Sequence, residues 1–312
     1  QLPPSSRNIE NKKVLADPRI DLEVKKKINL IIDTKKFFYH FFHLPPTQIY
    51  NKTTFLEREA VSYLVIASPA DLIEAKEHWF PFVGSFPYLG FFDEQSAKDY
   101  AIKLHNEGLV TYIRPVFAYS TLGYFEDRIL SSFFTFTDLE LVDLIFHELF
   151  HTIFFQKDEI DLNENLASYF SQKLVSKYYN FTSQEKIQFE KKASKNKEFF
   201  KRLVSEVNVL KENYINRKQD PPQVILKKFL TSFLPKMKAS CIESQNDDCD
   251  EFDTFEKWNN ARFAAVLTYE EFQPKVESWH QCFGDDLIKY FNFLQKTSQL
   301  YKQTSKDISI ID

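Results

Sequence analysis

Several features are scarce in this sequence of 312 residues, and each scarcity narrows the class of protein. No stretch of about 18 consecutive apolar residues occurs, so we expect no transmembrane helix. The formal net charge is only −4, which argues against nucleic acid or an anionic membrane as the main partner. Glycine occurs five times and methionine once, and no segment repeats at a fixed period. Apolar residues are abundant: hydrophobic residues make up 43% and aromatic residues 16%, which indicates a globular protein.

Cysteine is also scarce, with three residues, and none of them lies near the motif described below. Cys241 and Cys249 flank an acidic loop and would suit a disulfide in an exported protein; the alternative is that both, with Cys282, are unpaired thiols. The sequence starts at Gln1 with a polar, proline-containing stretch. We therefore expect residues 1–19 to be a flexible tether, and our hypothesis is a mature exported protein of the cell envelope or periplasm whose targeting segment lies upstream. A cytoplasmic protein is the alternative.

The most informative segment is Leu-Ile-Phe-His-Glu-Leu-Phe-His-Thr at residues 144–152, which contains the pattern H-E-x-x-H. On a helix, His147 and His151 lie about one turn apart on the same face, so both imidazoles can reach one metal ion. Glu148 follows the first of them, where a carboxylate can polarise water bound to zinc. Glu164 comes shortly afterwards and would be a third ligand. Two histidines and one glutamate leave a fourth position open, as in catalytic zinc sites.

The motif lies on a predicted buried helix. Thr137 and Glu140 have the spacing of a capping box, and a largely apolar run follows to about residue 155. Burying the polar side chains of the motif without partners would cost roughly 2–7 kcal/mol each, a cost that a metal ion removes. The alternative is a pair of hydrogen-bonded core histidines. A second helix is expected from about residue 161 to 179. Because the linker between the helices is short, they should pack antiparallel and bring Glu164 back towards the histidines.

The remaining elements follow from periodicity and from glycine and proline breaks. The clearest strand covers residues 109–119, and Pro115 predicts an edge position because proline cannot donate to a ladder. Residues 62–67 are also strand-like. We expect loops at 84–90 and 240–250, and helices at 20–43, 94–107, 183–236, 255–267 and within 272–300.

The link between the edge strand and the motif helix is a candidate substrate-binding segment. Exposed strand edges can hold an extended peptide by strand addition. We therefore expect this link to lie beside the metal and to contact the substrate backbone through Tyr119, Ser120, Thr121, Leu122 and Gly123. The alternative is a buried turn that requires Gly123. Glu126 and Asp127 come next, and a carboxylate could grip a free α-amine, but the sequence assigns that role to neither.

Several segments together resemble the bacterial putative aminopeptidase family, metallopeptidases of the gluzincin type with an H-E-x-x-H motif. The likeness rests first on the motif and on the downstream pair Asn163-Glu164, and it spans about residues 14 to 300. Further segments that carry it are 14–18, 88–93, 118–125 and 259–262, followed by Tyr269. The resemblance implies a zinc-dependent peptidase that is exported or held by a lipid anchor upstream, and activity on N-termini follows from the resemblance alone.

The chain departs from the gluzincin pattern at a place that bears on the site. Many gluzincins carry Asn-Glu-x-x-Ala-Asp, in which the Asp orients a ligand histidine. Ser168 stands at that place here, so we expect a different group to orient the imidazole. The spacing from His151 to Glu164 is also shorter than in the best-known gluzincins. It is similar to the compact spacing of the family named above, so Glu164 is kept as a ligand.

These patterns predict an α+β fold that is mainly α. It combines a zincin-like active-site helix with a small mixed sheet and a C-terminal helical lobe that closes over a zinc cleft. We expect a single metallopeptidase domain over residues 20–312. Its parts would be an N-terminal α/β part (20–136), the zinc-binding helices (137–180) and the helical lobe (183–312).

The predicted function is hydrolysis of peptide bonds, with Zn²⁺ bound by the two histidines and Glu164 and with Glu148 as general base. The substrate would be a peptide or protein, and the resemblance favours an aminopeptidase. The preferred donor to the oxyanion is Tyr269, ahead of Tyr119, Tyr124 and Arg262. One alternative is a zinc hydrolase of another amide or ester. Another is a non-enzymatic cell-envelope scaffold that retains the zinc site, although a purely structural site does not need Glu148.

Overall fold

The computed structural model describes residues 8–308 except 57, 59, 82–83, 118–125, 218 and 247. The fold is mainly α with small sheets, which confirms the predicted class. Two compact units share the chain: unit 1 contains residues 1–57, 118–178 and 272–312, and unit 2 contains residues 58–117 and 179–271. The helices expected to form one C-terminal lobe therefore divide between the units. No helix among the described residues has the length and apolarity needed to cross a membrane.

Unit 1 has a small mixed sheet near its N-terminal end. Strand β2 (Lys52–Thr54) lies in the centre, antiparallel to β1 (Ile9–Glu10) and parallel to β8 (Ile129–Leu130). Helix α1 (Asn11–Ala16) follows β1 directly. The structure thus differs from the tether expected over residues 1–19. The segment is folded from β1 to α1 because Val14 is buried and the Asn11 side chain donates to the backbone carbonyl of Tyr50.

Phenylalanine fills the core of unit 1. The ring of Phe38 on helix α2 stacks on Phe146, and Phe42 contacts Phe170. Phe150 stacks on Phe170 with ring centroids 4.4 Å apart. These aromatic contacts pack the motif helix against its neighbours on several sides. The helices of this unit are α1, α2 (Leu22–Phe41), α4 (Asp138–Ile153), α5 (Ile160–Tyr178), α9 (Gln273–Gln281) and α10 (Leu287–Ile308), with the short helix η1 (Ser131–Thr135) before α4.

Unit 2 is built on an antiparallel sheet with the order β6-β3-β7. Successive residues of a strand point to opposite faces, and β3 follows this rule. Val65 and Ala67 pack against residues of helix α3, while Leu64 and Ile66 line a hollow together with residues of helix α8. The elements are β3 (Ser62–Pro69), β6 (Leu89–Phe91), β7 (Leu109–Val116), α3 (Glu94–Asn106) and α8 (Asn260–Glu270), with the hairpin β4 (His78–Phe80) and β5 (Gly84–Phe86).

The sheet confirms one prediction and corrects another. Strand β7 is an edge strand, as Pro115 indicated, and Pro115 lies opposite Tyr63 in the register. The loop expected at residues 84–90 is wrong, because β5 and part of β6 lie there. These strands are only three residues long, and they are held by pairing with β4 and β3. Such short strands leave too little periodicity to be recognised in a sequence.

Long helices complete unit 2: α6 (Ser183–Ile215) and α7 (Pro222–Ser244), followed by the short helices η2 (Cys249–Asp253) and η3 (Phe255–Lys257). The single helix expected over residues 183–236 is wrong. The chain breaks before Pro222, which starts α7 at a position where a proline needs no amide hydrogen. The expected loop at 240–250 begins later, since α7 runs on to Ser244. Of the two cysteine alternatives, the structure has the disulfide between Cys241 and Cys249, and Cys282 is an exposed thiol.

Candidate metal centre

Helix α4 presents the motif, and its start is fixed by local hydrogen bonds. The Thr137 hydroxyl oxygen accepts from the backbone amide of Glu140, and the Glu140 carboxylate accepts from the backbone amide of Thr137 at 2.8 Å. This capping box confirms the predicted helix start. Most apolar side chains of α4 are buried, and His151 is only 6% exposed. The helix therefore holds its two histidines inside the protein, where unpaired polar groups are costly.

A buried asparagine fixes the turn between α4 and α5. The Asn163 amide donates to the carbonyl of Gln156 at 2.7 Å and accepts from the amide of Gln156 at 2.8 Å. Asn163 is 1% exposed, so these bonds are shielded from water. Sequence reasoning treated Asn163 only as part of a motif and missed this structural role. The bonds hold the first turn of α5, and with it Glu164, at the end of α4.

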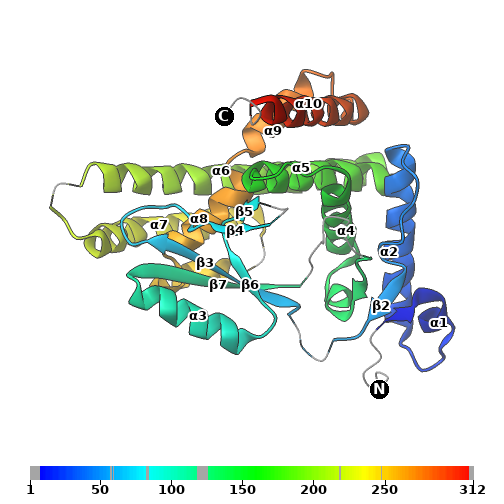
Figure 1. Cartoon of the computed structure of the whole chain (residues 1–312), viewed down its shortest axis with the longest axis horizontal. Coiled ribbons are helices and arrows are strands. Elements are labelled where there is room, and N and C mark those ends of the chain that lie inside the picture. Colours follow the sequence, from blue (N-terminus) through cyan, green and yellow to red (C-terminus); the bar gives the residue numbers. More distant parts are fainter. Residues whose placement is uncertain are drawn as a thin grey trace. The chain divides into compact units, whose positions relative to one another are not determined.

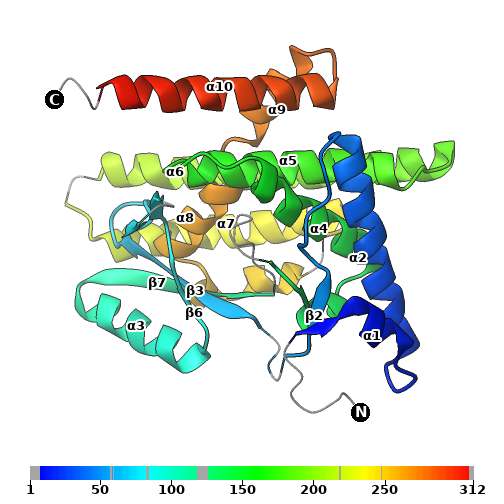
Figure 2. The same ribbon diagram turned by 45° about the vertical axis from the view of Figure 1, so that its right-hand side comes forward.

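The two helices of the motif pack against each other, but they cross rather than running antiparallel (Figures 1 and 2). The expected antiparallel packing is therefore wrong, although its consequence holds. Glu164 lies in the first turn of α5, where the crossing brings it to the histidines. The loop of residues 154–159 is long enough to allow either arrangement. The length of the linker therefore does not predict the angle between the two helices.

Three donor atoms converge at this crossing. His147 Nε2 lies 3.2 Å from Glu164 Oε2 and 3.1 Å from His151 Nε2. His151 Nε2 lies 3.6 Å from the same carboxylate oxygen. These residues form the one group among the described residues whose side chains could together hold a metal ion. Three electron-rich atoms this close repel one another unless a proton or a cation lies between them. The donor set therefore fits a divalent metal ion.

Charge and burial act in opposite directions on the carboxyl groups of the site. Burial opposes ionisation of Glu164, but the two neighbouring imidazoles outweigh it and hold the pKa of Glu164 below its usual range. Burial raises the pKa of Glu148, and the nearby histidines only partly offset that rise. Glu164 is thus the anionic member of the three candidate ligands. Glu148 is a carboxyl group whose affinity for protons is increased, which suits a group that takes up and releases a proton.

Ser168 corrects the expectation that some other group must orient the first histidine. Its hydroxyl oxygen lies 3.4 Å from Nδ1 of His147. With the proton on Nδ1 directed at this oxygen, Nε2 keeps its lone pair for a metal. The second histidine is different: Nδ1 of His151 is buried and has no hydrogen-bond partner in the part of the chain that the structure describes.

The acidic pair before β8 separates into two environments. Glu126 is exposed and forms an ion pair with Lys52 at 2.7 Å. Asp127 is buried, and its charge acts on Glu148, whose pKa it helps to raise. The sequence did not distinguish these neighbours, because alternation into and out of the protein is set by the fold. Asp127 is the member of the pair that belongs to the site.

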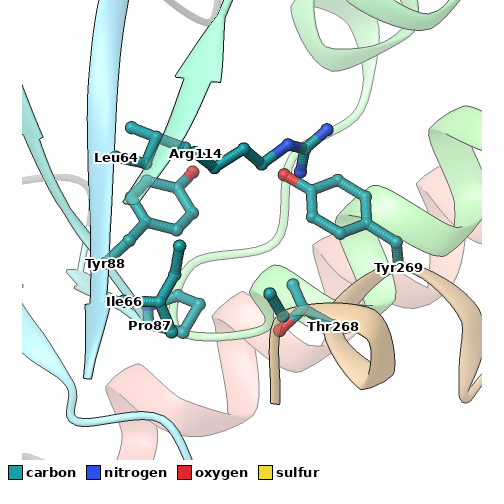
Figure 3. Close-up of a pocket in the computed structure, with 8 residues that line it drawn as sticks. Leu64, Ile66, Pro87, Tyr88, Arg114, Thr268 and Tyr269 are labelled. Carbon is teal, nitrogen blue, oxygen red and sulfur yellow. The ribbon is translucent and has the colours of Figure 1, made fainter. Parts of the chain in front are cut away.

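The structure does not test the remaining predicted site residues at the metal centre. Tyr119, Ser120, Thr121, Leu122 and Gly123 lie outside the described residues, as does Tyr124. Tyr269 belongs to unit 2, where the Arg114 guanidinium lies over its ring, 4.7 Å from the centroid, in the hollow beside α8 (Figure 3). Its role as oxyanion donor stays a prediction. Arg262 stacks on Trp258 at 4.0 Å and pairs with Glu251, which is a structural role.

The sequence was compared with models of protein families, with curated proteins and with solved structures. The model of a family described as "Putative aminopeptidase" matches residues 5–308, which is nearly the whole chain. No curated protein and no solved structure was found to match. The match covers both units and includes every residue of the candidate metal centre.

Proposed function

The chain belongs to that family, and we propose that it is a zinc-dependent peptidase that acts as an aminopeptidase. In this proposal His147, His151 and Glu164 bind the metal, and Glu148 is the general base. The observation that carries it is the convergence of three donor atoms on two crossing helices, beside a buried carboxyl group of raised pKa. The family description supports peptide substrates, and the donor set supports the metal.

The spacing of the donor atoms suits zinc. Ligand atoms on a tetrahedron with bonds of about 2.0–2.1 Å lie about 3.3–3.4 Å apart. The separations of 3.1, 3.2 and 3.6 Å among the three donors bracket that range. Two imidazoles and one carboxylate are also a ligand set of catalytic zinc, which keeps one position open for water or substrate. Nδ1 of His151 is buried and has no partner among the described residues, and a hydrogen bond to it would complete this arrangement.

In this proposal, different residues of the chain carry out different steps of hydrolysis. Bound zinc supplies Lewis-acid chemistry, which makes a water molecule acidic near neutral pH. Glu148 accepts the proton of the attacking water and delivers it to the amine that leaves. Its raised pKa favours the second step, because the protonated carboxyl must persist until the peptide bond breaks. Tyr269 is retained as the proposed donor to the oxyanion.

Substrate binding needs a grip on the backbone and, in an aminopeptidase, on the free α-amine. The edge strand β7 leads directly to residues 118–125, the segment expected to contact the substrate backbone. For the amine we propose Asp127, since it is a buried carboxyl group that acts electrostatically on Glu148 and, unlike Glu164, is not a proposed metal ligand. An ammonium group beside Asp127 would form a shielded ion pair, which is stronger than an exposed one.

The test combines metal analysis with peptide cleavage. Purified protein should contain one zinc per chain and should cleave peptides with a free N-terminus, while N-acetylated peptides of the same sequence are spared. His147→Ala should lose the zinc. His40→Ala, a change at an exposed histidine on α2, should keep it. Protein that binds no zinc, or zinc-loaded protein that cleaves esters or other amides but no peptide, would overturn the proposal.

A further inference from the structure

A buried carboxyl group on α4 has no role in the chemistry described so far. Asp143 lies four residues before His147, so both side chains lie on the same face of the helix. Its Oδ1 is buried and has no hydrogen-bond partner among the described residues. Burial raises the pKa of Asp143, and a side-chain hydrogen bond with Ser171 and the charge of His147 act against that rise. An unsatisfied buried carboxyl oxygen lowers the stability of the folded state, so its presence suggests a role in function.

Two serines of α5 lie between this carboxyl group and the first histidine. Ser171 is the hydrogen-bonding neighbour of Asp143, and its hydroxyl oxygen also lies 3.0 Å from the backbone carbonyl oxygen of Ser168, so its one hydrogen can serve either acceptor. The side chain of Ser168 lies 3.4 Å from Nδ1 of His147. Ser168 and Ser171 follow Glu164 at helical spacing, so they form the part of α5 that faces α4 at the site. The two serines thus link the ring of His147 to the carboxyl of Asp143, although the contact between them runs through the backbone carbonyl of Ser168 and not through its hydroxyl.

The charges around His147 indicate how Asp143 can affect metal binding. A metal-bound imidazole is a better ligand when a negative group lies behind its second nitrogen. Ser168 is a neutral acceptor at that position, so it orients the ring but adds no charge. The carboxyl of Asp143 adds a negative charge that acts on His147 from the same helix, in addition to the charges of Glu164 and Glu148.

We infer that Asp143 is a positioning residue of the metal centre, which supplies from α4 the negative charge that the neutral Ser168 lacks. This inference rests on the proposed function, because it concerns the affinity for zinc. It assigns Asp143 no contact with substrate or metal. Its effect is transmitted through Ser171 and Ser168 and through the electric field of the carboxylate.

The test is the zinc affinity of Asp143→Asn, measured on metal-depleted full-length protein by competition with a chelator. Asparagine keeps the shape and removes the charge, so zinc binding should weaken by about 10- to 100-fold. Asp138→Asn is the matched control, because Asp138 lies on the same helix but is exposed and paired with Lys27. Its zinc affinity should equal that of the wild type. Unchanged zinc affinity in Asp143→Asn would overturn the inference while the wild-type titration still supports the metal site.

Urea unfolding of the metal-free variants separates positioning from a structural role. Without metal, Asp143→Asn should be at least as stable as the wild type, because a desolvated carboxyl group has been removed. A structural role predicts the reverse, with lower metal-free stability and normal zinc affinity. If Asp143→Asn does not fold, Ser171→Ala provides the same test and should weaken zinc binding several-fold. A wild type that binds no zinc would reject the proposed function and this inference together.

Discussion

Units 1 and 2 differ in where their ionisable side chains lie. In unit 1, helices α4 and α5 hold two histidines and the carboxyl groups of Asp143, Glu148 and Glu164 in buried or half-buried positions, and the same helices carry the stacked rings of Phe150 and Phe170. In unit 2 most ion pairs lie at the surface, such as Lys238 with Asp253. Surface pairs of this kind contribute little to stability. Unit 2 also has an exception in Glu270, whose pKa burial raises to about 8.

The comparison shows that the core of unit 2 is apolar, whereas the core of unit 1 contains polar groups that reduce its stability. The core of unit 2 is a large apolar cluster on α6, α7 and α8, closed by a disulfide. The core of unit 1 contains polar groups whose burial lowers its stability. Residues that reduce stability and are nevertheless buried together mark a functional site. The predictions below test this difference between the units, from the largest expected effect to the smallest.

Glu148→Gln should lower peptidase kcat by about 10²- to 10⁴-fold, because the variant cannot accept a proton from water. The zinc content should stay at the wild-type level, since the substitution leaves the three ligands in place. Steady-state kinetics and metal analysis on the same preparation measure both quantities. Retained turnover would show that Glu148 is not the base, and lost zinc would show that it supports the ligands instead.

Matched substitutions of one phenylalanine by alanine in each unit should show that metal binding depends on unit 1 and that stability depends on both units. Phe150 in unit 1 and Phe233 in unit 2 are both fully buried, so each change to alanine should cost about 3–5 kcal/mol in urea unfolding. Phe150 is adjacent to His151 and packs on α5, so Phe150→Ala should also weaken zinc binding. Phe233→Ala should bind zinc normally. Equal zinc loss in both variants would contradict the assignment of the metal centre to unit 1.

Removing the disulfide should destabilise unit 2 alone. The double change Cys241→Ser and Cys249→Ser opens a short loop, for which chain entropy gives a loss of about 2.5 kcal/mol. Cys282→Ser, at the exposed thiol, should leave the unfolding midpoint where it is. Zinc affinity should be unaffected in both. A reducing agent should reproduce the loss in the wild type and have no effect on the double variant.

The smallest effect concerns a buried histidine of unit 1 that is not a ligand. Nδ1 of His280 accepts a hydrogen bond from the Tyr169 hydroxyl at 2.8 Å, and burial, aided by Lys173, lowers the pKa of His280 from 6.5. The native state therefore resists protonation. Its contribution to stability is present above about pH 6.5 and is lost as the pH falls through the lowered pKa. In metal-free protein, His280→Gln should flatten the fall of the urea midpoint in that range, and an unchanged slope would contradict this.

Local signals predicted the motif helix well. Its capping box and apolar run fixed α4 to within two residues of the expected ends, because helix starts depend on hydrogen bonds between near neighbours. The edge position of β7 followed from Pro115 for a similar local reason. Predictions failed where contacts between distant segments decide the outcome. Examples are β1 and α1, which are folded by contacts with residues 50–54, and the short strands β5 and β6.

The candidate site shows the same division. The spacing of His147 and His151 was enough to predict a shared ligand position, and the third ligand followed from its motif. The roles of Asn163, Ser168 and Asp143 could not be read from the sequence. An asparagine, a serine and an aspartate are common on protein surfaces, and only their neighbours across the α4–α5 crossing give them a function.

The sequence by itself determined that two imidazoles and a carboxylate occupy one short apolar helix. Their spacing is set by the helix repeat and needs no other part of the chain. Only the tertiary structure decided that Glu164 meets them, that Ser168 faces the ring of His147, and that the chain divides into two units. These outcomes depend on how side chains far apart in sequence fill a common core. Packing of that kind is a property of the whole chain, and no local pattern specifies it.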